Sequence, residues 1–196
     1  DDAAALYRIE NGRIRPSKML ADTLVGMLKG NREFVLIDDQ KVVYETCLAR
    51  VRNATAEKKQ VVIVRGGPGT GKSVVAINLI VALTKQGLLS KYISKNAAPR
   101  AVYAQKLRGH RKNVEISGLF GSSGAFFDAE PDAFDALVVD EAHRLNEKSG
   151  LYGNLGENQI KELIASAKCT ILFADDDQMV TLADIGHSAD LEKWAR

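Results

Sequence analysis

Short runs of β-branched and other apolar residues recur along the chain, and most of them end in glycine or polar residues. The runs that we predict to be strands are 61–64, 92–94, 114–116, 136–139 and 170–173. Between the first two runs, apolar residues from Val74 to Leu83 predict a helix that ends near Gly87. Strands that alternate with helices imply a parallel sheet whose strands are buried on both faces. The pattern therefore predicts an α/β domain with a mostly parallel sheet and helices on both faces.

The regions outside these runs complete the predicted layout. Residues 1–32 are expected to form a helical lead-in, with Ser17 as a helix cap, and residues 33–196 the domain itself. Inside the domain we expect loops at 118–124 and 148–156, and a helical or loop segment at 159–167. Because the chain starts without methionine and ends within a predicted helix, we expect it to be a fragment of a longer chain.

Composition bounds the class of protein. The chain has 196 residues, of which 45% are hydrophobic and 27% charged, as in an ordinary globular domain. It contains no run of 18 apolar residues, and its acidic start lacks the order of a signal peptide, so we expect a cytoplasmic protein without a membrane segment. Cys47 and Cys169 lack the spacing of zinc or redox sites and are predicted to be reduced core residues.

The charges divide the chain into two unlike parts. Residues 1–112 carry 21 Lys and Arg against 9 Asp and Glu, a net +12, whereas residues 113–196 carry 6 against 16, a net −10. The stretch from Lys85 to Lys112 has no acidic residue and includes Tyr92 and Tyr103. Such a stretch can face the phosphates of a nucleic acid, or it can be a solvated helix face. We expect the two tyrosines to be interior residues rather than base-stacking ones.

A glycine-rich loop follows the first predicted strand. Residues 66–73 match the pattern G-x-x-x-x-G-K-[ST] between a strand and a helix, where backbone N–H groups and the helix dipole can bind a phosphate. Lys72 is expected to reach the β- and γ-phosphates of ATP, and Ser73 to offer its hydroxyl to Mg²⁺. The predicted nucleotide-binding residues here are Gly67, Pro68, Gly69, Thr70, Gly71, Lys72, Ser73 and Val74.

Two further strands are predicted to end in acidic residues. After the strand at 136–139, Asp140 is expected to hold Mg²⁺ through water, and Glu141 to orient and deprotonate the attacking water. After the strand at 170–173, Gln178 is a candidate sensor of the γ-phosphate. The three acids at 175–177 fit either a metal cluster or a helix cap, and the residues alone leave both open. The histidines are predicted to be structural or coupling residues, namely His110, His143 and His187.

Together these motifs resemble motifs I, II and III of superfamily 1 helicases, in the same order. More narrowly, residues 96–100, 134–137, 142–146 and 153–159 resemble the Schlafen group 3-like helicase domain family, and the likeness covers roughly 33–190. The resemblance implies a RecA-like P-loop NTPase domain that hydrolyses ATP with Mg²⁺. It also implies that Gln40 reads adenine, and that Asn96 and Arg100 contact single-stranded DNA or RNA. Lys72, Asp140, Glu141 and Gln178 are the catalytic candidates.

The resemblance also defines what the chain lacks. We expect no second RecA-like domain within these 196 residues, so the arginines that such enzymes supply from that domain would be missing here. Because an arginine finger contributes roughly 10³ to 10⁵ in rate, we expect weak hydrolysis from this chain alone. Two other functions remain open at this point: an ATP-dependent switch or adaptor that acts on protein partners, and a small-molecule phosphotransferase, for which no lid or acceptor site is found.

Overall fold

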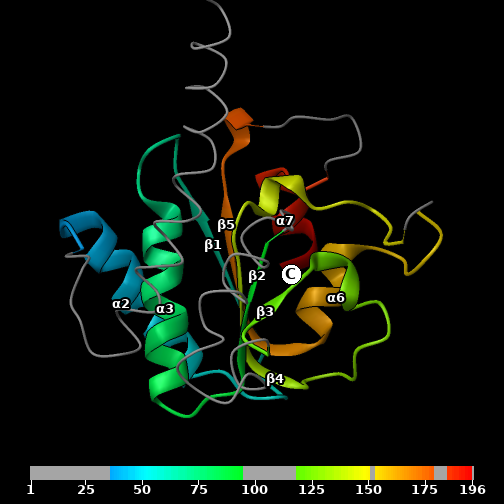
Figure 1. Cartoon of the computed structure of the whole chain (residues 1–196), viewed down its shortest axis with the longest axis horizontal. Helices are drawn as coiled ribbons and strands as arrows, with labels where there is room; N and C mark the ends of the chain where they lie inside the picture. The colour runs from blue at the N-terminus through cyan, green and yellow to red at the C-terminus, as the bar shows by residue number, and fades with distance from the viewer. Residues whose placement is uncertain (1–35, 95–117, 151–152, 179–184, 196) are drawn as a thin grey trace, which may run out of the picture.

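A parallel β-sheet forms the centre of the molecule (Figure 1). The computed structural model describes residues 36–94, 118–150, 153–178 and 185–195. The sheet in these residues has five strands in the order β1-β5-β4-β2-β3, and every pairing is parallel. The strands are β1 (Gln60–Arg65), β2 (Ser90–Ile93), β3 (Phe120–Gly121), β4 (Phe134–Val139) and β5 (Ala167–Ala174).

Helices cover both faces of the sheet, which confirms the predicted α/β fold. Figure 1 shows α2 and α3 on one side of the strands and α6 and α7 on the other. The helices are α2 (Asp38–Arg52), α3 (Lys72–Lys85), α6 (Gln159–Ala165) and α7 (Ser188–Ala195). The described residues also contain three single turns of 3-10 helix: η1 (Ser123–Ala125), η2 (Ala142–Arg144) and η3 (Asp176–Gln178).

Strand β4 shows why the strands appear as continuous apolar runs. Ala136 and Val138 point into the core beneath α2 and α3, whereas Leu137 and Val139 point into the core beneath α6. All four are fully buried or nearly so. Successive side chains of a strand point to opposite faces, so a strand covered on both faces needs an apolar residue at every position.

Two local predictions need correction. Residues 38–52 were not predicted as a helix, although Val43, Cys47 and Val51 recur every four residues and pack into the core of α2 and α3. The predicted loop at 118–124 contains β3, in which Phe120 pairs with Tyr92 of β2. A strand of two residues is too short for its alternation to be recognised in the sequence.

Several other predictions have clear outcomes. The helix at the end of the chain is present as α7, and Tyr92 is an interior residue with 3% of its surface exposed. Cys47 and Cys169 are free and buried, and burial raises the pKa of both thiols to about 12. None of the described helices is long and apolar enough to cross a membrane. Outside the described residues lie the lead-in 1–32, the predicted strand 114–116, Asn96, Arg100, Tyr103 and His110.

Candidate functional site

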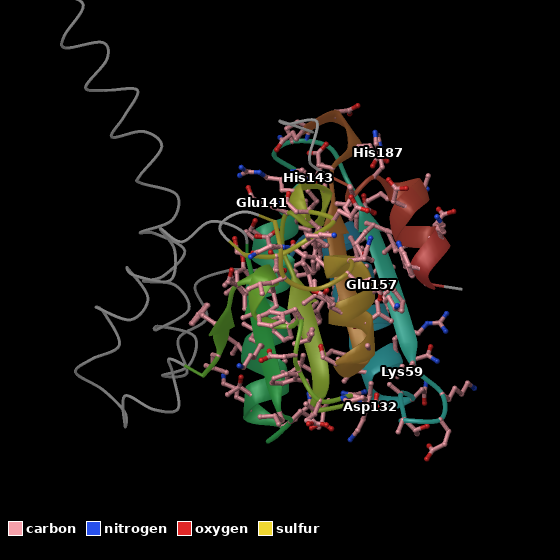
Figure 2. The ribbon with its side chains drawn as sticks, turned by 90° about the vertical axis from the view of Figure 1, so that its right-hand side faces the viewer. Lys59, Asp132, Glu141, His143, Glu157 and His187 are labelled. Carbon is pink, nitrogen blue, oxygen red and sulfur yellow. The ribbon has the colours of Figure 1, made fainter. Side chains whose placement is uncertain are left out.

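The carboxyl ends of β1, β4 and β5 bring three polar loops to one edge of the sheet. The register pairs Arg65 with Ala174 and Val139 with Leu172, so these strands finish nearly level. Figure 2 shows Glu141 and His143 at this end of the molecule, while Lys59 and Asp132 lie at the opposite end. This edge is where open α/β sheets bind ligands, and it carries all three motifs noted in the sequence.

The loop between β1 and α3 is built for close approach of an anion. Gly69 and Gly71 have positive φ values of 74° and 84°, which favour glycine over other residues. Nothing lies within 4 Å of where a Cβ atom of Gly67 or Gly69 would stand, so these positions face open space. Helix α3 starts at Lys72 directly after this loop and directs its N-terminal dipole toward the same space.

Lys72 is held over the loop by three acceptors. Its Nζ donates to the backbone carbonyl oxygens of Gly66 at 2.5 Å and Gly67 at 2.7 Å. It also forms an ion pair of 3.0 Å with Oδ2 of Asp175, at the end of β5. The Asp175 side chain is 1% exposed and that of Lys72 is 15% exposed. The ammonium group is therefore held beside the pocket by a buried carboxylate.

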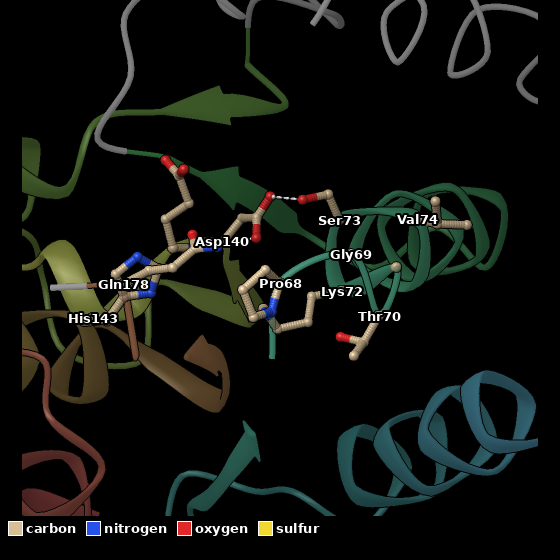
Figure 3. Close-up of a pocket in the computed structure, with 11 residues that line it drawn as sticks. Pro68, Gly69, Thr70, Lys72, Ser73, Val74, Asp140, His143 and Gln178 are labelled. Carbon is tan, nitrogen blue, oxygen red and sulfur yellow. Dashed lines mark hydrogen bonds between the residues drawn. The ribbon is translucent and has the colours of Figure 1, made fainter. Parts of the chain in front are cut away.

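Asp140 lies against the first turn of α3. Its Oδ2 accepts a hydrogen bond of 2.7 Å from Oγ of Ser73, drawn as a dashed line in Figure 3. The same oxygen accepts a bond of 2.5 Å from the hydroxyl of Tyr92, and Oδ1 accepts from the backbone N–H of Glu141 at 3.0 Å. The structure thus brings together Ser73 and Asp140, the two predicted Mg²⁺ residues, and it adds a contact from Tyr92 that the sequence did not predict.

Glu141 has an unusual backbone conformation. Its φ of 53° and ψ of 42° place it in the left-handed region, which a residue with a side chain rarely adopts. Such conformations cluster at functional sites because the surrounding structure must hold them in place. Here the conformation ends β4 and starts η2, and Glu141 lines the pocket. Its carboxylate lies 3.9 Å from the guanidinium of Arg144.

His143 connects the loop after β4 with the loop after β5. It is 2% exposed, and its Nδ1 accepts a hydrogen bond of 3.2 Å from the backbone N–H of Asp175. Burial lowers the pKa of this imidazole, and the nearby Asp175 carboxylate opposes the shift. A neutral ring that accepts at Nδ1 carries its proton on Nε2. His143 is therefore a buried residue that joins two loops of the site.

The acids after β5 have separate roles. Asp175 pairs with Lys72, whereas Oδ1 of Asp176 accepts a hydrogen bond of 2.9 Å from the backbone N–H of Ser188, the first residue of α7. Bonds from Ser188, together with the nearby His187, hold the pKa of Asp176 below its usual value. Of the two interpretations left open by the sequence, the helix cap applies to Asp176.

These loops enclose a pocket of about 270 Å³ (Figure 3). Its lining contains ten of the predicted site residues and one addition, His143. The lining residues are Pro68, Gly69, Thr70, Gly71, Lys72, Ser73, Val74, Asp140, Glu141, His143 and Gln178. Of the other predicted residues, Gly67 lies in the same loop and accepts hydrogen bonds from Lys72 and Thr70.

Gln40 lies beside the pocket rather than in its lining. Its Nε2 donates to the backbone carbonyl of Thr70 at 3.0 Å, and its Oε1 accepts from the backbone N–H of Ile37 at 3.3 Å. A Cβ atom on Gly71 would approach Nε2 of Gln40 to 2.3 Å. The side chain therefore packs directly on the glycine-rich loop, and its amide is bonded to protein groups on both ends.

The donor set of the pocket suits a nucleotide with a hard cation. The glycine positions leave room at the loop for phosphate oxygens, and Lys72 supplies a positive charge next to them. The Ser73 hydroxyl and the Asp140 carboxylate offer oxygen atoms 2.7 Å apart, and oxygen ligands are those that Mg²⁺ prefers. The residues present therefore fit ATP and Mg²⁺, and Ser73 and Asp140 offer the oxygen atoms that would hold the cation.

Gly186 packs closely against the backbone of η2, the turn that contains the pocket residue His143. A Cβ atom on Gly186 would stand 1.8 Å from the carbonyl oxygen of Ala142 and 2.7 Å from Cα of His143. Both contacts are with backbone, which cannot turn away as a side chain can. Gly186→Ala is expected to lower the unfolding free energy by about 1–3 kcal/mol, the usual effect of overpacking. Thermal unfolding measures this loss.

Gly124→Ala is the matched control for that prediction. The nearest atom to its added methyl group is Oγ of Ser149 at 3.4 Å, an ordinary contact, so little change is expected. Equal melting temperatures for the Gly186→Ala variant and the parent chain would contradict the close packing described here.

Known proteins resemble this chain. A family model described as Schlafen group 3, DNA/RNA helicase domain, matches residues 59–196. The chain is 24% identical over 140 residues to Protein RecA of Wolbachia sp. subsp. Brugia malayi (strain TRS), covering 62% of this chain and 39% of that protein. It is 29% identical over 107 residues to Protein RecA of Staphylococcus carnosus (strain TM300), covering 53% of this chain and 30% of that protein.

The matched region contains every strand of the sheet and every residue that lines the pocket. Helix α2 and Gln40 precede it. The chain spans 39% or less of the length of these two relatives. The parallel sheet, the pocket at its carboxyl edge and the similarity to RecA show that the chain contains a nucleotide-binding RecA-like domain. By its family match, the chain belongs to the Schlafen group 3 DNA/RNA helicase domain family.

Proposed function

We propose that this chain is the first RecA-like motor domain of a nucleic-acid-dependent helicase-like protein, and that it binds and hydrolyses ATP with Mg²⁺. One observation carries the proposal. Two segments that are distant in sequence place Lys72, Ser73, Asp140 and Glu141 around one pocket, with the Ser73 hydroxyl 2.7 Å from the Asp140 carboxylate. A solvated pair of acids at a strand end would not need this arrangement.

Each residue has a defined part in the proposed reaction. Backbone N–H groups of residues 67–73 bind the phosphates, and Lys72 moves from Asp175 to the phosphate oxygens. Ser73 and Asp140 hold the cation, and Glu141 takes a proton from the attacking water. Mg²⁺, when bound, offsets negative charge on the phosphate oxygens. Gln178 lines the same pocket and is proposed to sense the γ-phosphate.

The nucleic-acid partner is proposed from sequence and family together. The matched family is described as a DNA/RNA helicase domain, and the acid-free stretch 85–112 contains Asn96 and Arg100. We propose that single-stranded DNA or RNA binds along this stretch, and that a second RecA-like domain completes the motor. Gln40 is proposed to contact adenine, because its helix lies against the phosphate-binding loop.

Single-stranded DNA or RNA is expected to stimulate ATP turnover, and the stimulation should weaken as salt rises. Each phosphate neutralised by Lys or Arg releases counterions, so the affinity should fall about tenfold or more between roughly 50 and 200 mM salt. The experiment measures ATP turnover with and without each nucleic acid at both salt concentrations. Glu141→Gln is the hydrolysis-deficient control.

The outcomes separate the competing functions. Stimulation that disappears at high salt and in the control supports the motor domain. Tight binding of ATP and Mg²⁺ without any stimulation supports a switch that acts on protein partners instead. A chain that binds no ATP in the presence of Mg²⁺ contradicts both functions.

A further inference from the structure

We propose that Tyr92 is a positioning residue, which holds the carboxylate of Asp140 in the orientation required for the Mg²⁺ side of the site. This inference rests on the proposed function and extends it to a residue outside the sequence motifs. The Tyr92 hydroxyl lies 2.5 Å from Oδ2 of Asp140, and it reaches that atom from β2, a strand that contributes no residue to the lining of the pocket.

The tyrosine is fixed on its strand by its surroundings. It is 3% exposed, its backbone N–H donates to the carbonyl of Leu119 at 2.7 Å, and it pairs with Val138 of β4 in the register. Its ring meets that of Phe120 edge to face, with 5.8 Å between the centroids. A side chain that is buried in the core, on a strand paired along both edges, has little freedom to follow a ligand, so its hydroxyl is a fixed donor.

Among the described residues, three groups donate to Asp140, and they differ in whether they can still donate after the cation binds. The Ser73 hydroxyl donates to Oδ2 at 2.7 Å, but a hydroxyl that ligates a cation must turn its lone pair toward it. In the proposed site, the Tyr92 hydroxyl and the backbone N–H of Glu141 are not ligands of the cation and can keep donating to Asp140. They restrain one carboxylate oxygen each, so together they hold the plane of the carboxylate when Ser73 turns away.

A neutral donor suits this position. Asp140 is 7% exposed, and when the Ser73 hydroxyl turns to the cation, the Tyr92 hydroxyl still donates to Oδ2 of this buried carboxylate. A lysine or arginine at this position would satisfy the oxygen but would also cancel the negative charge that attracts the cation. The phenol hydroxyl orients the carboxylate and leaves its charge in place.

Tyr92→Phe tests the proposal because it removes only the hydroxyl. The readout is binding of a fluorescent, non-hydrolysable ATP analogue, titrated with Mg²⁺ and repeated in EDTA. The Mg²⁺ concentration at half-saturation should rise about tenfold, the factor expected for loss of a hydrogen bond to a charged group of about 1.4 kcal/mol. Affinity in EDTA should stay within about twofold of the parent chain, because the phosphate-binding loop is unchanged.

Two further variants distinguish positioning from packing. Tyr44→Phe removes the hydroxyl of a partly buried tyrosine that packs against the same core through α2 and should leave the Mg²⁺ midpoint unchanged. In an Asp140→Asn background, Tyr92→Phe should change the Mg²⁺ midpoint by less than a further twofold, because Tyr92 acts through the Asp140 carboxylate. An equal further shift in that background would overturn the proposal.

The same titration separates this inference from the proposed function. A parent chain whose nucleotide affinity does not depend on Mg²⁺ would overturn both. A Mg²⁺-dependent parent with an unchanged midpoint in Tyr92→Phe would overturn only the role of Tyr92.

Discussion

Replacing Lys72 with alanine is expected to lower the affinity for ATP with Mg²⁺ at least about 100-fold. Within the described residues, Lys72 is the only lysine or arginine in the pocket lining, and its Nζ lies beside the phosphate-binding loop. If Lys72 is removed, a bound phosphate loses a charge-assisted hydrogen bond in a site that is partly shielded from water. Titration of a fluorescent ATP analogue measures the loss, and turnover should fall with it.

Lys72→Ala also removes the ion-pair partner of the buried Asp175 carboxylate, so it is expected to lower stability as well as nucleotide affinity. Asp175 is 2% exposed, and leaving it unpaired should lower the unfolding free energy by about 3 kcal/mol. The double variant Lys72→Ala, Asp175→Asn removes this unpaired charge. Its melting temperature should recover most of the loss, while its nucleotide affinity should stay low.

The matched control is Lys85→Ala, an exposed lysine in the last turn of the same helix. It makes the same chemical change far from the pocket and should bind ATP as the parent chain does. Lys72→Ala that binds ATP and Mg²⁺ as tightly as the parent would contradict the assigned pocket.

Glu141→Gln should abolish most ATP turnover and leave binding nearly intact. Loss of a general base lowers the rate by about 10² to 10⁴, and glutamine keeps the shape of the side chain without accepting the proton. The left-handed backbone at Glu141 is set by the turn into η2, so the substituted side chain should occupy the same position. Single-turnover hydrolysis measures the rate, and analogue binding measures the affinity.

Glu147→Gln provides the comparison for this variant. Glu147 is an exposed acid six positions later in the same loop region, and it does not line the pocket. Turnover of Glu147→Gln should match that of the parent chain. If Glu141→Gln hydrolysed ATP at a similar rate, the base would have to be another residue, and the proposed role of Glu141 would be wrong.

The sequence predicts a structural feature correctly where a single short segment determines the conformation of that feature. The strand, glycine-rich loop and helix at 60–85 are continuous in sequence, and their backbone geometry depends mainly on the residues in that segment. The fold class also followed from sequence, because strands buried on both faces leave continuous apolar runs. Helix α2 was missed even though its apolar residues recur at helical spacing, because its mean character is polar and its N-cap residue, Ile37, has no polar side chain that could signal a helix start.

The remaining features of the site depend on contacts between distant residues. Lys72 and Asp175 are 103 positions apart, and Tyr92 and Asp140 are 48 apart. Hydrophobic periodicity shows which face of a strand is buried, but it does not show which strand will be its neighbour. The order β1-β5-β4-β2 decides both pairings, by placing β5 beside the loop that carries Lys72 and β2 beside the strand that ends at Asp140.

By itself, then, the sequence determined the glycine-rich loop between a strand and a helix, the acids that follow two strands and the α/β class, because each is a local pattern. Only the tertiary structure decided how the three acids after β5 divide their roles, that His143 joins two loops, and that Tyr92 restrains Asp140. These assignments require the strand order and the distances between side chains, which arise when the two layers of helices pack on the sheet.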